Sequence, residues 1–340
     1  MEKVCTFSII IPVYNVEKYI KKCLQSLKDQ TFEDFEALIV NDESKDGSLS
    51  IINEFANSDN RFKVINKKNE GPGIARNAAL KDIKGKYVLF VDPDDYINPE
   101  TLQLLKEQFD KTNAQVIQFD YRKVYENSIK AELSTLKNVN DNSFYNYNSF
   151  KNKDLSNYRL MVWDKAYKSD FIRDNKIEFA PNYHAEDHIF SLKTLFLADK
   201  IFYINKYFYN YLTRMNSSSN KKSSNNFCIF DNIKLIQEFL DENKFSYKFN
   251  KEFSLYKTTV LKWHYNAISD EDKQPYLNKC QEVLSKKDYQ GLYKKIKNRD
   301  RTFIEQIFSV KNKTDNTIKT KIVTIFGFEF ILKKGVKIGT

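Results

Sequence analysis

The first 95 residues of this 340-residue chain alternate between apolar segments of strand length and segments with helical spacing. Helix-length crossovers between successive strands are what parallel strands require, because a short hairpin can join only antiparallel ones. The sequence therefore predicts an α/β fold with a mostly parallel, Rossmann-like sheet flanked by helices. The strand-like segments are 6–12, 35–41, 62–65 and 87–91, and the helix-like segments are 16–30, 47–57 and 74–83.

The last of these strands ends in a cluster of acids, Asp92, Asp94 and Asp95, around one proline. Ligands of such sheets bind beyond the carboxyl ends of the strands. Carboxylates clustered there repel one another unless a cation lies between them, and hard divalent ions prefer oxygen ligands. We therefore expect Mn²⁺ or Mg²⁺ at this cluster, together with a phosphorylated substrate. An acidic turn that caps the predicted helix 99–110 is the alternative.

Polar residues also follow the first and second strands, namely Tyr14, Asn15 and Asp42. A dinucleotide-binding enzyme would carry a glycine-rich turn after the first strand. Residues 12–15 (Pro-Val-Tyr-Asn) contain no glycine, which argues against that class of enzyme. The later tripeptide 71–73 (Gly-Pro-Gly) is either a simple turn or a phosphate cradle, and the sequence leaves both open.

Five strings resemble, in order and spacing, the bacterial family-2 inverting glycosyltransferases of GT-A fold, and the resemblance covers about residues 6–215. It implies a metal-dependent hexosyltransferase that moves a sugar from a nucleotide-sugar, expected to be a UDP-sugar. The acceptor would be a hydroxyl of a bacterial surface glycan such as lipooligosaccharide or capsule, free or lipid-linked. The strings are 8–20 (SIIIPVYNVEKYI), 27–32 (LKDQTF), 40–48 (VNDESKDGS), 73–78 (GIARNA) and 90–95 (FVDPDD).

The resemblance also implies roles for single residues. Asp42 would read the uracil edge, although Asn41 and Glu43 beside it depart from the family pattern. Arg76 would face the diphosphate, where a guanidinium can donate two hydrogen bonds at once. Asp94, with Asp92, would hold the Mn²⁺ or Mg²⁺. The complete set expected to bind the nucleotide-sugar is Pro12, Tyr14, Asn15, Asp42, Arg76, Asp92, Asp94 and Arg214.

On the acceptor side, Glu186-Asp187 resembles the family's Glu-Asp pair at a helix start, so Asp187 would be the catalytic base. Glu186 and Asp95 would support it or contact the acceptor. Trp163 would stack on a sugar ring or pack in the core. His184 and His188, four residues apart, would form a metal site only if one helix held both, and we favour an acceptor-binding or surface role.

Arg214 opens the string 214–219, which resembles a loop that folds over the donor phosphates as a lid. The polar tract 216–226 that follows marks a domain boundary, with residues 1–215 as the GT-A catalytic domain. Residues 216–340 would form a helical, basic C-terminal module, with helices expected at 227–240, 253–267 and 273–284.

Charge and cysteine usage bear on location and partners. The net charge is +10, and basic residues recur between 286 and 301 and again between 311 and 337. They predict peripheral contact with an anionic membrane face, or only a solvated lysine-rich surface. Four scattered cysteines and the lack of a signal peptide favour the cytoplasm, at the inner face of the inner membrane. No nucleic-acid recognition motif and no nucleotidyltransferase signature loop accompany the charge, so neither alternative class is favoured.

Overall fold

The computed structural model describes residues 4–126, 131–136, 139–181, 184–214, 224–315, 318–325 and 328–335. They divide into two compact units, Met1–Leu277 and Asn278–Thr340. The domain boundary expected near residue 215 therefore falls inside the first unit. Helices α7 (Ile229–Glu242) and α8 (Ser246–Asn266) pack on each other, and α7 also packs on α6 (Asp187–Leu197), so they belong with the sheet rather than apart from it.

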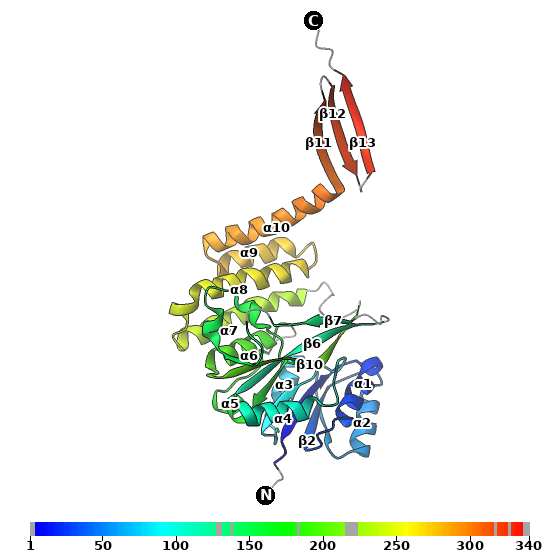
Figure 1. The fold of residues 1–340 in the computed structure, drawn as a ribbon, viewed down its shortest axis with the longest axis vertical. Coiled ribbons are helices and arrows are strands. Elements are labelled where there is room, and N and C mark those ends of the chain that lie inside the picture. The colour runs from blue at the N-terminus through cyan, green and yellow to red at the C-terminus, as the bar shows by residue number, and fades with distance from the viewer. Residues whose placement is uncertain are drawn as a thin grey trace. The chain divides into compact units, whose positions relative to one another are not determined.

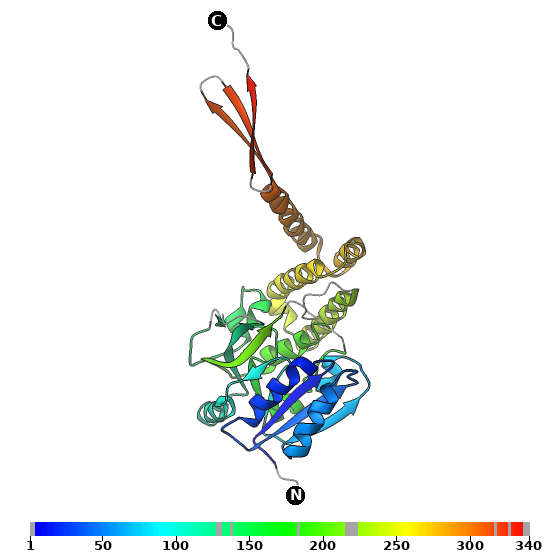
Figure 2. The ribbon, with the colours of Figure 1, turned by 90° about the vertical axis from the view of Figure 1, so that its right-hand side faces the viewer.

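The N-terminal half follows the predicted alternation closely, with helices of the first unit on both sides of the sheet in Figures 1 and 2. The predicted and observed ends differ by at most three residues through the fourth strand. The elements are β1 (Phe7–Val13), α1 (Glu17–Lys28), β2 (Phe35–Asp42), α2 (Ser48–Ser58), β3 (Phe62–Lys67), α3 (Pro72–Leu80), β4 (Tyr87–Phe90), β5 (Tyr96–Ile97) and α4 (Thr101–Thr112).

The second half of the first unit extends the same sheet with strands of mixed direction. Its strands are β6 (Val116–Tyr125), β7 (Ala131–Ser134), β8 (Ser143–Tyr145), β9 (Lys165–Lys168) and β10 (Ile201–Thr213). Its short helices are η1 (Tyr147–Phe150), η2 (Leu155–Tyr158), α5 (Ser169–Asp174) and η4 (Ser224–Cys228). The described residues between β6 and β9 thus include the strands β7 and β8 and the short helices η1 and η2.

The main path of the sheet runs β3-β2-β1-β4-β9-β6-β10-β5. Neighbours from β3 to β4 are parallel, as the sequence predicts, and β6 is parallel to β10. Strand β9 runs antiparallel to both β4 and β6 and joins the two parallel blocks, so the sheet is mixed. Since β5 pairs with β10, the segment after the acidic cluster is fixed at the far edge of the sheet.

Alternating residues of the strands build the main core of the first unit. Phe7, Ile9 and Ile11 on β1 are fully buried in one cluster with Leu24 of α1 and Ile52 of α2. In Figure 2 these two helices, in blue, lie over the blue strands. Burial of such side chains contributes roughly 1.5–3 kcal/mol each, which makes the ends of these strands a rigid platform.

The second unit is not wholly helical, which corrects the expectation for the C-terminal module. After α9 (Lys273–Val283), which spans the unit boundary, it contains α10 (Lys286–Ile307) and the strands β11 (Phe308–Asp315), β12 (Ile318–Ile325) and β13 (Phe328–Gly335). The three strands form an antiparallel sheet, drawn in brown to red in Figure 1. The β-branched residues of 318–325 (IKTKIVTI) explain this preference. No helix among the described residues is long and apolar enough to cross a bilayer.

Candidate functional site

The three acids after β4 lie at the carboxyl end of the parallel strands, and each has a different partner. Asp92 accepts a hydrogen bond from Arg76 Nη2 at 2.7 Å. Asp94 accepts bonds from Arg214, including one from Nε at 3.0 Å. Asp95 is buried, accepting bonds from the Tyr209 hydroxyl and the Leu212 N–H, both at 2.7 Å.

Asp95 therefore ties the acidic segment to β10 through these two bonds. Tyr209 serves both neighbours, because its hydroxyl also accepts the backbone N–H of Asp92 at 3.0 Å. The sequence did not single out this tyrosine, since the chain contains 21 tyrosines and residues 95 and 209 are far apart along it. Only the pairing of β5 with β10 brings them together.

Mutual repulsion persists in the acidic cluster despite these partners. Burial, and then the charge of Asp92, raise the pKa of Asp94 above its usual range, although Arg214 opposes the shift. Burial and the charges of Asp94 and Asp92 raise the pKa of Asp95 further. Carboxylates with raised pKa values at the end of a strand are stabilised by an added cation.

Asp92 and Asp94 fit a hard divalent ion as a partial set of ligands. Their side chains are 24% and 20% exposed, so their oxygens reach solvent. No group of three or more His, Cys, Asp or Glu side chains in the described part of the chain is arranged to hold a metal. Two carboxylates suffice where phosphate oxygens and water complete the shell, as is usual for Mg²⁺.

Arg76 on α3 joins the two halves of the site. Its Nη2 binds Asp92 and its Nη1 binds Glu186 Oε1, both at 2.7 Å. Burial alone would lower the pKa of this guanidinium, but the charges of Asp92 and Glu186 raise it above its usual range. Its buried Nε has no hydrogen-bond partner among the described residues. The family resemblance implied that Arg76 faces the diphosphate, and the structure places its side chain between Asp92 and Glu186.

Two residues close to Arg76 in the string 73–78 explain how α3 approaches residues 179, 180 and 186. A Cβ on Gly73 would lie 2.4 Å from the carbonyl oxygen of Ala180, so only glycine allows this approach. Asn77 donates to the carbonyl of Phe179 at 3.0 Å and accepts its N–H at 2.9 Å. Sequence reasoning assigned a role to Arg76 alone, although the same string carried these two residues.

Asp187 is the first residue of α6, and Glu186 precedes it as the N-cap, which confirms the expected helix start. Glu186 is buried and bound to Arg76, whereas Asp187 is partly exposed and no hydrogen bond to another side chain is seen for it among the described residues. Burial, and then the charge of Glu186, raise the pKa of Asp187 to about 8. A carboxylate with raised proton affinity is suited to accept a proton near neutral pH.

Asp42 is buried at the end of β2 and holds the loop between β3 and α3. It accepts hydrogen bonds from Lys67 Nζ at 2.8 Å, from the Gly71 N–H at 2.9 Å and from the Glu70 N–H at 3.2 Å. Gly71 has φ of 93°, a conformation that glycine adopts without strain. The Gly71 N–H is thus engaged by Asp42, and the tripeptide 71–73 forms a turn and the start of α3.

The remaining expected donor residues lie at or near the end of β1. Pro12 is buried within the strand, and Tyr14 is 48% exposed just beyond it. Asn15 has a left-handed backbone with φ of 51°, and its Oδ1 accepts the Lys45 N–H at 2.7 Å. These residues share the sheet edge with Asp42 and Asp92, as the parallel register of β1 with β2 and β4 requires.

Trp163 and His188 are buried, which favours packing over the acceptor roles considered for them. The Trp163 ring stacks on Tyr209 at 4.5 Å and on Tyr211 at 5.4 Å between centroids. Nδ1 of His188 is 2.9 Å from the Tyr256 hydroxyl, and burial lowers the pKa of the imidazole to about 3. Arg214 lies 4.4 Å from the Tyr19 ring centroid, while the rest of the expected lid, 215–219, falls outside the described residues.

Comparison with known proteins agrees with this arrangement. The model of the family described as Glycosyl transferase family 2 matches residues 8–169. The chain is 32% identical to the putative glycosyltransferase EpsH of Bacillus subtilis over 62% of this chain and 61% of that protein. It is 33% identical to the Staphylococcus aureus poly(ribitol-phosphate) beta-N-acetylglucosaminyltransferase TarS over 61% of this chain and 35% of TarS. The chain thus spans less than two thirds of the length of these relatives.

The fold has a solved counterpart. The crystal structure of S. aureus TarS 1–349 in complex with UDP-GlcNAc matches with a TM-score of 0.60 and 24% identity, covering 98% of this chain and all of that one. The mixed sheet, the flanking helices and the position of the acids at the strand ends are those expected of a GT-A-like fold. By sequence, residues 8–169 thus match the domain of glycosyl transferase family 2, and the fold agrees with that match.

Proposed function

We propose that this chain is a metal-dependent inverting glycosyltransferase that moves a sugar from a UDP-sugar to a hydroxyl of a bacterial surface glycan. The observation that carries the proposal is the buried Arg76, which binds both Asp92 on the donor side and Glu186 beside Asp187. One guanidinium thus fixes the spacing between a candidate donor site and a candidate base. The likeness to a protein crystallised with UDP-GlcNAc supports the choice of a uridine nucleotide.

Asp187 is proposed as the base. In an inverting transfer the acceptor hydroxyl attacks the anomeric carbon from the face opposite the leaving nucleotide, and a carboxylate removes its proton. Asp187 lies at the N-terminal end of α6, is partly exposed, and has the raised pKa that the task requires. Glu186 is bound to Arg76 and is proposed to position the pair.

The donor would lie along the ends of β1, β2 and β4. Asp42 is proposed to contact uracil through the outer lone pairs of its carboxylate, Tyr14 to flank the base, and Asp92 to approach the ribose. Asp94 and Asp92 would hold Mn²⁺ or Mg²⁺, which when bound offsets charge on the diphosphate that leaves. Arg214 would turn from Asp94 toward the phosphates once that charge arrives, because it already lies within reach of the same carboxylate.

Two relatives are named for poly(ribitol-phosphate) acceptors, one from S. aureus and one from Bacillus spizizenii. On that basis we extend the proposed acceptor class, which includes lipooligosaccharide and capsule chains, to surface glycans that carry phosphodiesters. The proposed place of action is the cytoplasmic face of the inner membrane, with the basic segments between 286 and 337 contacting anionic lipid. Within the compact unit Met1–Leu277, residues 1–215 are proposed to carry the catalytic side chains.

The test is a panel of nucleotide-sugars incubated with the protein, with and without Mn²⁺, followed by measurement of the released nucleotide. The proposal predicts Mn²⁺-stimulated release of UDP from at least one UDP-sugar, and more in the presence of a surface-glycan acceptor. Release from none of the donors, with no binding of UDP by calorimetry, would refute the proposal.

A further inference from the structure

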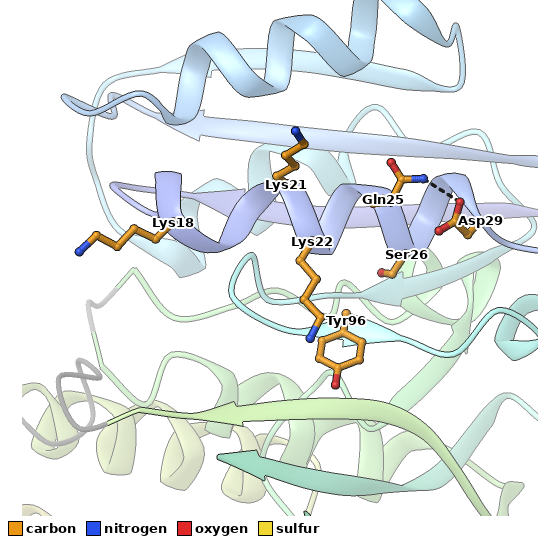
Figure 3. A pocket seen from close by; sticks show the side chains of 7 residues that line it. All are labelled: Lys18, Lys21, Lys22, Gln25, Ser26, Asp29 and Tyr96. Carbon is orange, nitrogen blue, oxygen red and sulfur yellow. Dashed lines mark hydrogen bonds between the residues drawn. The ribbon is translucent and has the colours of Figure 1, made fainter. Parts of the chain in front are cut away.

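Helix α1 presents a row of lysines beside a surface hollow of about 490 Å³. Lys18, Lys21 and Lys22 line it together with Tyr96 of β5, and Figure 3 shows Lys22 reaching toward that ring. We call this region the α1 lysine hollow. The helix turns its apolar residues inward, so its lysines are left on the exposed face.

The charge of the α1 lysine hollow is not neutralised by the protein. None of its three lysines forms an ion pair within the described ranges, and Lys22 Nζ lies 3.6 Å from the Tyr96 ring centroid instead. Asp29 is the one acid among the lining residues, and Gln25 donates to it at 2.7 Å. Unpaired lysines that share a concave surface attract anions and raise their local concentration.

The α1 lysine hollow adjoins the proposed donor site along the chain. Tyr96 directly follows Asp95, and Tyr19, one residue after Lys18, lies under the Arg214 guanidinium that binds Asp94. Below them, the Cys23 thiol lies 3.6 Å from the carbonyl oxygen of Asp92. A chain lying in the hollow would therefore lead toward the acidic cluster.

We propose that the α1 lysine hollow docks an acceptor glycan that carries phosphodiesters, an inference that rests on the proposed function. Three separated lysines suit repeated phosphates along a polymer better than one small ligand, since no buried polar group among the lining residues would orient it. The Tyr96 ring offers an apolar face for the carbon chain of a sugar or polyol. The hollow would hold acceptor units upstream of the reacting hydroxyl and so favour anionic over neutral acceptors.

An anionic membrane is the competing partner, and the helix argues against it. A helix that lies on a membrane inserts apolar side chains between lipids while its lysines meet the headgroups. The buried residues of α1 are Ile20, Cys23, Leu24 and Leu27, which pack into the core and are not available to lipid. The outward face of α1 is thus suited to a hydrophilic polyanion.

The test compares the triple variant Lys18→Gln/Lys21→Gln/Lys22→Gln with wild type in binding to a fluorescent ribitol-phosphate oligomer. Fluorescence anisotropy at low salt should show an affinity about ten-fold weaker for the variant, and a shallower dependence of affinity on salt. A neutral oligosaccharide should bind equally to both proteins. UDP binding by calorimetry should be unchanged, because no substituted lysine belongs to the proposed donor site.

The matched control is Lys234→Gln/Lys248→Gln/Lys251→Gln, which removes three exposed lysines from α7 and α8 and makes the same change in net charge. It should bind the oligomer like wild type. Equal binding by wild type and the α1 variant, or equal losses in both variants, would overturn the proposal. The proposal would also be overturned if the α1 variant lost only its sedimentation with phosphatidylglycerol vesicles and still bound the oligomer like wild type. Oligomer binding needs no nucleotide-sugar donor. Failure of the nucleotide-sugar panel would therefore refute the proposed function without deciding whether the α1 lysine hollow binds the oligomer.

Discussion

Replacement of Gly73 by alanine tests how α3 positions the two acidic segments. The added Cβ would lie 2.4 Å from the Ala180 oxygen and 3.0 Å from Cβ and Cγ of Glu186, so the backbone must move apart. Overpacking of this kind costs about 1–3 kcal/mol, against a gain in helix propensity of at most about 1 kcal/mol. We expect a net loss of stability of about 1–2 kcal/mol.

Turnover should fall more steeply than stability. The clash separates α3 from the segment that carries Glu186, so the Arg76–Glu186 bond of 2.7 Å lengthens and Asp187 shifts with its neighbour. A misplacement of about 1 Å can cost on the order of 100-fold in rate, and we expect a fall in kcat of about 10- to 100-fold. Urea titration followed by tryptophan fluorescence gives the stability, and steady-state kinetics give kcat.

Gly291 provides the matched control for the same substitution. It lies in α10, and an added Cβ there would meet no atom within 4 Å. Gly291→Ala should stabilise the helix by up to about 1 kcal/mol and leave turnover unchanged. If Gly73→Ala instead matched wild type in stability and kcat, the close approach of α3 to residue 180 would not position the base, and the reasoning would be refuted.

Three further predictions concern the carboxylates and Arg214. Burial and the charge of Glu186 raise the pKa of Asp187 to about 8, so kcat/KM should rise with pH through neutrality. Glu186→Gln should move this rise to lower pH, because the substitution removes a negative neighbour of Asp187. A rise at the same pH in the variant would count against an effect of Glu186 on the pKa of Asp187. Asp94→Asn should weaken Mn²⁺-dependent UDP binding at least about ten-fold by calorimetry; equal titrations would show that Asp94 is no ligand. Arg214→Gln should strengthen Mn²⁺ binding in the absence of nucleotide, because it frees Asp94, and it should weaken UDP binding. Electron paramagnetic resonance titration of free Mn²⁺ measures the first effect, and weaker Mn²⁺ binding by the variant would contradict the prediction.

The sequence was sufficient for the parallel half of the sheet and for the identity of its polar edge. Apolar runs of four to eight residues between amphipathic helices specify parallel strands, and β1, β2 and β4 form as expected. The strand ends then bring Tyr14, Asp42 and Asp92 to one edge without any knowledge of side-chain contacts. The five strings that resemble the family lie within this region.

The partners of those residues depend on tertiary approach and could not be predicted. Asp92 and Glu186 meet at Arg76 only because Gly73 and Asn77 allow residues 179, 180 and 186 to lie against α3. Nothing in the spacing along the chain encodes that contact. The sequence left two roles open for Trp163 for a similar reason, since a flat ring serves equally well in a core or under a sugar.

The C-terminal sheet was missed because its strands mix lysine with β-branched residues. Apolar and polar side chains alternate imperfectly along residues 318–325 (IKTKIVTI). The composition therefore favours a basic tail over a strand. The segment forms a strand because β12 pairs with β11 on one side and with β13 on the other. This pairing is seen in the structure and not in the sequence.

The assignment of Asp187 as the base is the centre of this account, and single-turnover kinetics of Asp187→Asn test it most directly. With saturating UDP-sugar, Mn²⁺ and acceptor, the amide should transfer at least about 1,000-fold more slowly than the carboxylate, within the range that general-base groups contribute. UDP should still bind with wild-type affinity, since Asp187 is not among the proposed donor contacts. A transfer rate equal to that of wild type would contradict the account.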